Sequence, residues 1–145
     1  MVIIPVLKSM AMHSPAAVNL LLGTAAQESH LGQYLVQVKG PALGIYQMEP
    51  DTHDDIWRNF LKYRPTLGAI VQQLTFPARG MKNQLIGNLY YATAMARVAY
   101  YRHPEKLPNA DDIVGLAGYW KNFYNTPLGK GTKEEFIANY RRFVH

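Results

Sequence analysis

The sequence predicts a mainly α fold in a single domain that spans residues 1–145. Apolar residues recur at helical spacing in about six segments, and capping residues, Pro or Gly mark the ends of these segments. One stretch, residues 31–50, is too rich in Gly and Pro to be helical. Since 48% of the 145 residues are hydrophobic and only 17% are charged, the chain can bury one core of ordinary size.

The first predicted helix covers residues 15–30. Ser14 is a favourable N-cap, and Pro15 fits the first helical position, where its missing N–H is no loss. Four apolar residues at helical spacing define its buried face: Val18, Leu21, Leu22 and Ala25. Residues 31–50 then form an irregular insertion. Residues 34–38 and 43–48 are expected to be short extended pieces, at most a small β-hairpin.

The second and third predicted helices cover residues 52–63 and 65–74. Thr52, with Asp55 three residues later, approximates a capping box, and Pro65 opens the third helix. A Pro/Gly loop is expected over residues 76–80. The fourth helix, residues 83–102, has the longest pattern, with one face made by Leu85, Ile86, Leu89, Ala92, Ala96 and Ala99. Its small residues suit a central helix with close neighbours.

The last two predicted helices cover residues 110–124 and 133–145. Asn109 is the expected N-cap of the first of them, with Asp111 and Asp112 in its first turn. Thr132, followed by Glu135, opens the second. The chain is therefore expected to have six helices, with one small irregular or β-hairpin insertion after the first.

Charge and composition restrict the classes of function. The net charge is +5, and residues 79–145 carry ten Lys/Arg against five Asp/Glu, whereas residues 1–78 carry five of each. This imbalance suits either a polyanionic partner or a solvated basic surface. No run of Lys/Arg resembles a nucleic-acid-binding arm, so no nucleic-acid partner is predicted.

Neither a metal, a cofactor nor a membrane span is expected. The chain has no cysteine, and its five histidines lack metal-ligand spacing. No stretch of about 18 apolar residues exists, which argues against membrane insertion. His13, Pro15 and Asn19 interrupt the apolar start of the chain, so no signal peptide is predicted.

Glu28 is the only acidic residue in the first 48 positions, and it continues the apolar face of the first predicted helix. Burial disfavours a carboxylate, so its pKa is expected to rise by roughly one to several units. Such a group stays protonated near neutral pH and can donate a proton. At this point a helix-end Glu that reaches solvent is an equally good interpretation.

The insertion that follows Glu28 contains Gly44-Ile45-Tyr46-Gln47-Met48-Glu49-Pro50. Gly44 permits close backbone approach, Gln47 offers an amide, and Tyr46 offers an aromatic face. A cleft with one protonatable carboxyl, amide groups and aromatic walls suits a neutral sugar polymer.

These residues carry a family resemblance. Glu28-Ser29 and the segment Ala42 to Pro50 resemble two motifs of the lytic transglycosylase (SLT) family, in the form carried by tailed bacteriophages. A third motif of that family, Tyr-Asn-x-Gly, resembles Tyr124-Asn125 with Gly129 further along. The chain departs from the family pattern at Tyr46, at Glu49 and in the loop before Gly129.

The resemblance implies a lysozyme-like (α+β) SLT domain with Glu28 as the catalytic acid/base. The expected substrate is the peptidoglycan glycan strand, cleaved between N-acetylmuramic acid and N-acetylglucosamine to leave 1,6-anhydro ends. The expected substrate-binding residues are Ser29, Tyr46, Gln47, Glu49, Tyr119, Tyr124 and Asn125. A virion-associated enzyme or endolysin of this kind resides in the phage virion or the host cytoplasm and acts on the host cell wall, beside other virion proteins.

Two alternatives stay open. A goose-type lysozyme hydrolyses the same bond with a second carboxylate that holds water, for which Glu49, Asp51, Asp54 and Asp55 are nearest in sequence. A non-catalytic structural or wall-binding virion protein is the alternative of another class. Tyr119 and Trp120 suit a cleft wall or the core equally well.

Overall fold

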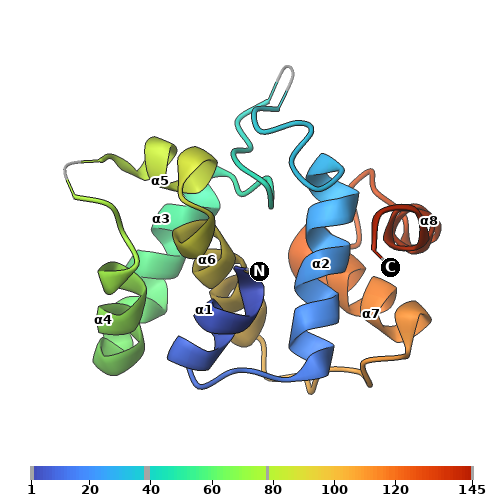
Figure 1. Cartoon of the computed structure of the whole chain (residues 1–145), viewed down its shortest axis with the longest axis horizontal. Helices are drawn as coiled ribbons and strands as arrows, with labels where there is room; N and C mark the ends of the chain where they lie inside the picture. Colours follow the sequence, from blue (N-terminus) through green and yellow to red (C-terminus); the bar gives the residue numbers. More distant parts are fainter. Residues whose placement is uncertain (1, 38–39, 78, 145) are drawn as a thin grey trace.

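The computed structural model describes residues 2–37, 40–77 and 79–144, and these form a mainly helical fold (Figure 1). The α-helices in this part are α1 (Ile3–Ser9), α2 (Pro15–Ser29), α3 (Pro50–Asn59), α4 (Pro65–Gln73), α5 (Met81–Gly87), α6 (Leu89–Tyr101), α7 (Ile113–Trp120) and α8 (Lys133–Phe143). A 3-10 helix, η1 (Leu61–Tyr63), follows α3, and a π-helical turn, η2 (Lys121–Asn125), follows α7. The predicted mainly α class is confirmed.

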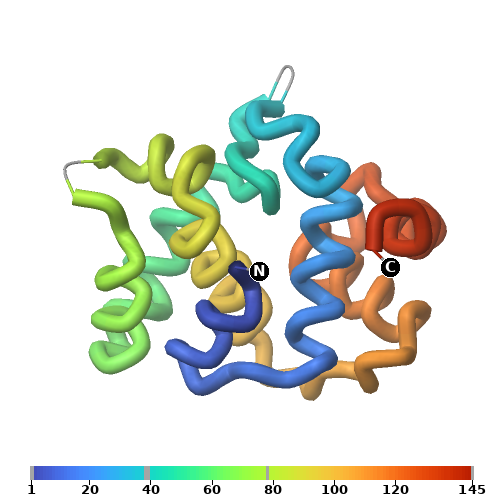
Figure 2. Tube along the Cα trace, viewed as in Figure 1, coloured from blue at the N-terminus to red at the C-terminus, as the bar shows by residue number. Residues whose placement is uncertain are grey.

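The helices form two groups with α6 between them. One group contains α1, α3, α4 and α5, and the other contains α2, α7 and α8 (Figures 1 and 2). Each group surrounds one apolar cluster, and α1 contributes to both, with Ile3 and Leu7 in the cluster of α2, α7 and α8 and Val6 in the other. Side chains of α6 enter both clusters: Ala92, Ala96 and Tyr100 pack with α2 and α7, while Met95 and Val98 pack with α3 and α4. This central helix therefore joins the two halves, as its small residues predicted.

The prediction of one long helix over residues 83–102 is wrong in one respect, because the structure has two helices there, α5 and α6. Asn88 has extended backbone angles and caps α6, since its side chain accepts a hydrogen bond from the N–H of Tyr91. Its amide nitrogen also donates to the carbonyl of Leu74 and to Gln84. Local side-chain hydrogen bonds thus replace a helical turn. Leu89, predicted on the buried face, is exposed.

The structure adds a helix that the sequence pattern did not predict. α1 buries Ile3, Val6 and Leu7 against the core. Its seven residues are too few to show a helical period clearly, and tertiary packing stabilises it. The apolar start of the chain is therefore part of the fold.

Two predicted helix starts are also wrong. α3 begins at Pro50, with Glu49 as its N-cap, instead of at the predicted Thr52, and Asp54 and Asp55 therefore lie beyond its first turn. α7 is capped by Asp112, which accepts a hydrogen bond from the N–H of Gly115, and the predicted N-cap Asn109 lies before it. The caps at Ser14 and Thr132 are confirmed.

The insertion after α2 contains no extended hairpin in its described residues. α2 ends where His30, Leu31 and Gly32 adopt left-handed backbone angles, which turn the chain back. Two isolated bridges follow, Val36 with Leu43 and Leu43 with Met48. Val38, the end of one predicted extended piece, lies outside the described residues.

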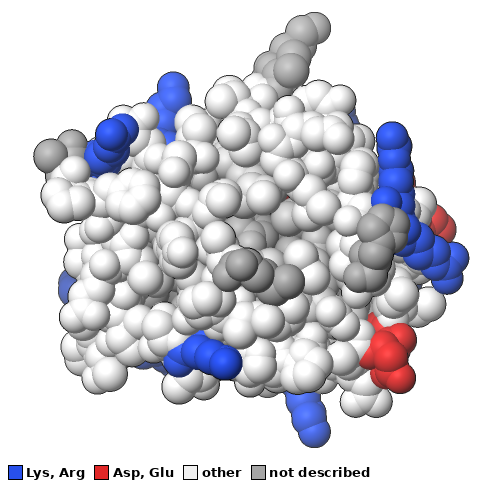
Figure 3. Space-filling model, in the orientation of Figure 1, with Lys and Arg blue, Asp and Glu red and all other residues white. Residues whose placement is uncertain are grey.

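The surface carries the excess positive charge in a dispersed form. On the face drawn in Figure 3, Lys and Arg side chains project around the rim, and the acidic side chains group on the side of α7 and α8. Within residues 2–37, 40–77 and 79–144, no helix has both the length and the hydropathy to cross a membrane.

Candidate active site

Glu28 lies in the last turn of α2, half-buried on the wall of a cavity of about 650 Å³. The end of α2, the insertion, the start of α3, the end of α6 and the turn after α7 all contribute to this wall. The lining residues are Glu28, Gln37, Ala42, Gln47, Met48, Glu49, Thr52, Ala99, Arg102, Phe123, Tyr124, Asn125, Thr126, Gly129, Lys130 and Gly131. The cavity, hereafter the Glu28 cavity, is of the size that holds a small ligand or part of a polymer.

Burial and one hydrogen bond set the acidity of Glu28. Burial in apolar surroundings raises its pKa from 4.5 to about 7, although the indole N–H of Trp120 donates to Oε1 at 3.0 Å and opposes the rise. The predicted rise in pKa is confirmed. Because Trp120 is bound to Oε1, the carboxyl group has a fixed orientation and its second oxygen can carry the proton. At neutral pH the protonated and ionised forms are both well populated.

Ser29 holds the insertion against α2. Its hydroxyl donates to the carbonyl of Ile45 at 2.6 Å and accepts from the N–H of Gly32 at 2.9 Å. Ser29 is fully buried. Although it was predicted to bind substrate, no ligand can reach it, so it positions the segment that covers Glu28.

Gly44 allows the insertion to approach α5. Its φ is +81°, and a Cβ atom built there would lie 1.9 Å from the carbonyl oxygen of Leu85. No residue with a side chain fits this position without moving backbone. The glycine of the predicted motif is thus required for the insertion to pack closely against α5.

Gln47 lies at the cavity wall in a strained conformation. Its φ is +48°, in the left-handed region that residues other than Gly seldom adopt. Its amide nitrogen donates to the carbonyl of Gly44 at 2.9 Å, which keeps the side chain close to its own loop. Strain of this kind is common at functional sites. Gln47 lines the same cavity as Glu28, and its role in binding substrate stays a prediction.

Tyr124 connects the turn after α7 to the insertion. Its hydroxyl donates to the carbonyl of Tyr46 at 2.6 Å, and its ring stacks on Tyr100 at 5.2 Å. Burial first, and then the nearby charge of Glu28, raises its pKa well above 10. Tyr124 therefore stays neutral and forms one wall beside Glu28.

The π-helical turn and the loop after it form a further part of the rim. Lys121 donates to Asn125 at 2.7 Å and to the carbonyls of Gly129 and Gly131, so one ammonium holds the whole loop. Thr126, in this loop, has φ +89°, a rare conformation for a β-branched residue. π-helical turns occur often at functional sites.

Two other predicted substrate-binding residues lie outside the Glu28 cavity. Tyr46 is only 3% exposed, and its hydroxyl pairs with Thr93 at 2.9 Å. Tyr119 is buried, and its hydroxyl donates to the carbonyl of Glu105. Both predictions are corrected, because the local sequence does not show whether an aromatic side chain packs in the core or lines a cleft. Of the predicted set, Gln47, Glu49, Tyr124 and Asn125 line the cavity with Glu28.

The sequence prediction left Arg102 out of the site, and it left Trp120 open between a cleft wall and the core. Trp120 is fully buried yet touches the carboxyl group, which no local pattern indicates, because 92 residues separate it from Glu28. Arg102 lines the cavity and pairs with Asp55 at 2.8 Å. Only the fold brings these residues together.

Among the acidic residues considered as a second carboxylate, only Glu49 lines the Glu28 cavity. Asp55 binds Arg102 and Asn59, and Asp54 contacts His53 at 3.0 Å. These two aspartates have structural partners elsewhere. A hydrolytic alternative therefore depends on Glu49.

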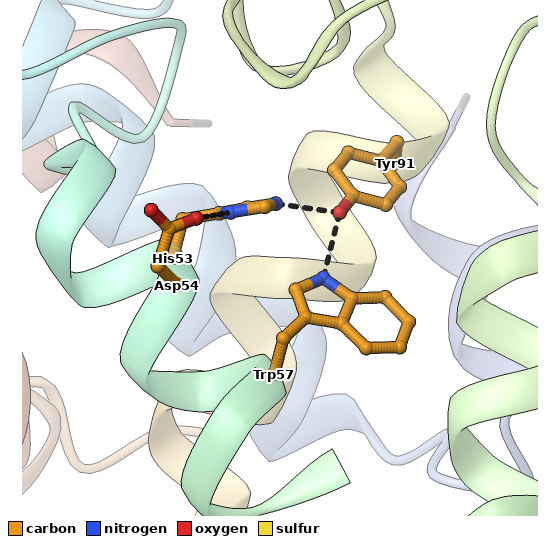
Figure 4. Close-up of polar contacts among 4 residues, drawn as sticks. All are labelled: His53, Asp54, Trp57 and Tyr91. Carbon is orange, nitrogen blue, oxygen red and sulfur yellow. Dashed lines mark hydrogen bonds and ion pairs between the residues drawn. The ribbon is translucent and has the colours of Figure 1, made fainter. Parts of the chain in front are cut away.

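A separate polar cluster joins α3 to α6 (Figure 4). The indole N–H of Trp57 donates to the hydroxyl of Tyr91 at 2.9 Å, and this hydroxyl lies 2.6 Å from Nε2 of His53. Nδ1 of His53 is 3.0 Å from Asp54. Since Tyr91 accepts from Trp57, its own proton is directed to His53, and each group is satisfied. The cluster acts as a structural link between the helices.

Within the described residues, no three His, Asp or Glu side chains gather closely enough to hold a metal ion. Comparison of the chain with protein-family models, with curated proteins and with solved structures gave no match.

Proposed function

We propose that this chain is a peptidoglycan-cleaving lytic transglycosylase with a lysozyme-like architecture. The observation that carries the proposal is the carboxyl group of Glu28, with a pKa of about 7, on the wall of a cavity of about 650 Å³. The resemblance of Glu28-Ser29 and of the segment around Gln47 to the SLT motifs supplies the substrate class. The cavity supports this assignment because Gln47, Tyr124 and Asn125 line it together with Glu28.

The first step uses the protonated form of Glu28. The carboxyl group donates its proton to the glycosidic oxygen between N-acetylmuramic acid and N-acetylglucosamine. The bond from C1 to this oxygen breaks, and the N-acetylglucosamine 4-hydroxyl leaves. The hydrogen bond from Trp120 stabilises the carboxylate that remains, so it assists the proton transfer.

The second step uses the ionised form. The muramoyl 6-hydroxyl attacks C1, and its proton passes to Glu28 as the 1,6-anhydro ring closes. No water is consumed, and the acid is regenerated for the next cycle. A pKa near 7 suits both steps, because the same group must give and then accept a proton.

Hydrolysis by a goose-type lysozyme mechanism is the second candidate. It is favoured by one observation, the presence of Glu49 on the wall of the same cavity. In that case Glu49 would hold and activate a water molecule, and the products would carry reducing ends.

Digestion of purified peptidoglycan separates these possibilities. The wild type, Glu28→Gln and Glu49→Gln are each incubated with the same sacculi, and the soluble fragments are identified by mass spectrometry. Anhydromuramoyl ends from the wild type and Glu49→Gln, with none from Glu28→Gln, are the expected result. Reducing ends, one water heavier, that disappear in Glu49→Gln would favour the lysozyme.

The same digestion tests whether the chain is an enzyme at all. If the folded wild type releases no fragment from sacculi, the enzymatic proposal fails. A cosedimentation assay with the sacculi then distinguishes a wall-binding virion protein from one that does not bind the wall.

A further inference from the structure

A second cavity lies beside the end of α6 and the loop after it. It has a volume of about 420 Å³, and among the residues that line it only Arg102 also lines the Glu28 cavity. We call it the Arg97 cavity. Its lining includes the basic residues Arg64, Arg97, Arg102 and Lys106, with Glu105 as the only acidic one.

Arg97 is a buried cation without a counter-charge. Its residue surface is only 8% exposed, and its Nε is buried without a hydrogen-bond partner. Among the described residues, no carboxylate forms an ion pair with it. Its guanidinium carbon lies 5.8 Å from the centre of the Tyr101 ring. Burial lowers the pKa of Arg97, but a guanidinium remains charged in proteins.

A buried guanidinium of this kind is costly for a folded protein. A polar group that is buried without a hydrogen-bond partner loses its hydration, and native proteins therefore pair almost all of their buried polar groups. Removal of one partner from a buried ion pair leaves just such an uncompensated charge. The geometry of Arg97 is thus that of a cation whose partner is a ligand.

The surroundings of Arg97 add positive charge. Arg64 stacks on the Phe60 ring at 4.0 Å, which orders its guanidinium at the cavity wall. Arg102 binds Asp55 through Nη1, while its Nε is buried and has no partner. Burial and the charge of Arg102 lower the pKa of His103, the next residue along the wall.

We propose that the Arg97 cavity binds a compact oxyanion, either a carboxylate or a phosphate group. A guanidinium presents planar donors that match both oxyanions with two parallel hydrogen bonds, and Arg64 and Lys106 supply further positive charge. A volume of about 420 Å³ holds the oxyanion together with part of the molecule that carries it. This site does not include Glu28, although it shares the lining residue Arg102 with the Glu28 cavity, and the proposed cleavage reaction does not use it.

Calorimetric titration of the full chain tests the site. Inorganic phosphate is one probe and sodium acetate the other, each against sodium chloride at equal ionic strength, so that specific binding is separated from screening. The wild type is expected to bind at least one of them with saturation. Phosphate alone would assign the site to a phosphate group, and acetate binding would assign it to a carboxylate.

Arg97→Met and the control Arg141→Met separate this site from general surface charge. Arg141 is an exposed arginine on α8, and it does not line the Arg97 cavity. Arg97→Met should weaken binding of the oxyanion more than tenfold, and Arg141→Met should change it less than twofold. Without an oxyanion, Arg97→Met should unfold at the same or a higher urea concentration than the wild type, because it removes an unpaired buried charge.

Two exposed positions keep the test valid if Arg97→Met does not fold. Arg64→Gln and Lys106→Gln each remove a positive charge from the wall and are expected to weaken binding three- to tenfold. The proposal is overturned if the wild type binds neither phosphate nor acetate. It is also overturned if the Arg97 variant, or both exposed variants, bind as the wild type does.

Discussion

The raised pKa of Glu28 predicts that its replacement by glutamine stabilises the protein at alkaline pH. The folded-state value of about 7 exceeds the ordinary value of 4.5 by about 2.5 pH units, which at 1.36 kcal/mol per unit corresponds to about 3 kcal/mol. A carboxyl group whose pKa is raised by folding binds more protons in the folded state than in the unfolded state between these two pKa values. The contribution of Glu28 to the stability of the wild type should therefore fall as the pH rises from about 4.5 to about 7, and then remain at the lower level.

Glu28→Gln removes this dependence because an amide does not titrate. The glutamine oxygen can still accept the hydrogen bond from Trp120, so the local packing is kept. Relative to the wild type, the variant should gain up to about 3 kcal/mol in the free energy of unfolding between pH 4.5 and pH 8. It should at the same time lose all cleavage of peptidoglycan. Under the proposed function, Glu28 lowers the stability of the fold in exchange for activity, which is a known compromise.

Urea denaturation at half-unit intervals from pH 4.5 to pH 8.5 measures the effect, with Glu49→Gln as the control. Glu49 is exposed, so its replacement should leave the pH dependence of the wild type in place, within about 0.5 kcal/mol. If the stabilities of Glu28→Gln and the wild type run parallel over the whole range, the carboxyl group is not buried as described, and the reasoning from its pKa is refuted.

Three further outcomes are expected. Trp120→Phe removes the donor that favours the Glu28 carboxylate, so the alkaline limb of the pH–rate profile of the proposed cleavage should move up by about one to two pH units. This shift corresponds to roughly 1.5–3 kcal/mol for a hydrogen bond to a charged group, and an unmoved limb would contradict it. Tyr91→Phe should cost about 1–3 kcal/mol in urea denaturation, because it leaves the buried His53 and the half-buried indole N–H of Trp57 without their partner. The exposed Tyr90→Phe should cost under about 0.5 kcal/mol, and equal costs would count against the cluster. Gly44→Ala should lower both the activity and the melting temperature, because the added Cβ would clash with the backbone of Leu85. Gly80→Ala, which has open space around it, should not lower the activity. An unchanged melting temperature in Gly44→Ala would disprove the close approach.

The local sequence was enough for several parts of the fold. Ser14 and Thr132 cap their helices as predicted, because a side chain that accepts from an N–H three residues later needs no distant contact. The raised pKa of Glu28 was also predictable, since a carboxyl group on an apolar helix face is buried whenever that face is. The break at Asn88 was missed because its side chain binds Leu74 and Gln84 in a way that only packing reveals.

Tertiary structure decided which side chains reach the Glu28 cavity. The motif residues Gln47 and Tyr46 are adjacent in sequence, yet the left-handed turn at Gln47 directs one to the cavity and leaves the other in the core. The packing of α7 against α2 places Trp120 beside Glu28, although 92 positions separate the two residues in the sequence. A short-range pattern records which face of an element is apolar. Which distant face it meets is set by the packing of the whole chain, and that packing creates both the partner of Glu28 and the uncompensated charge of Arg97.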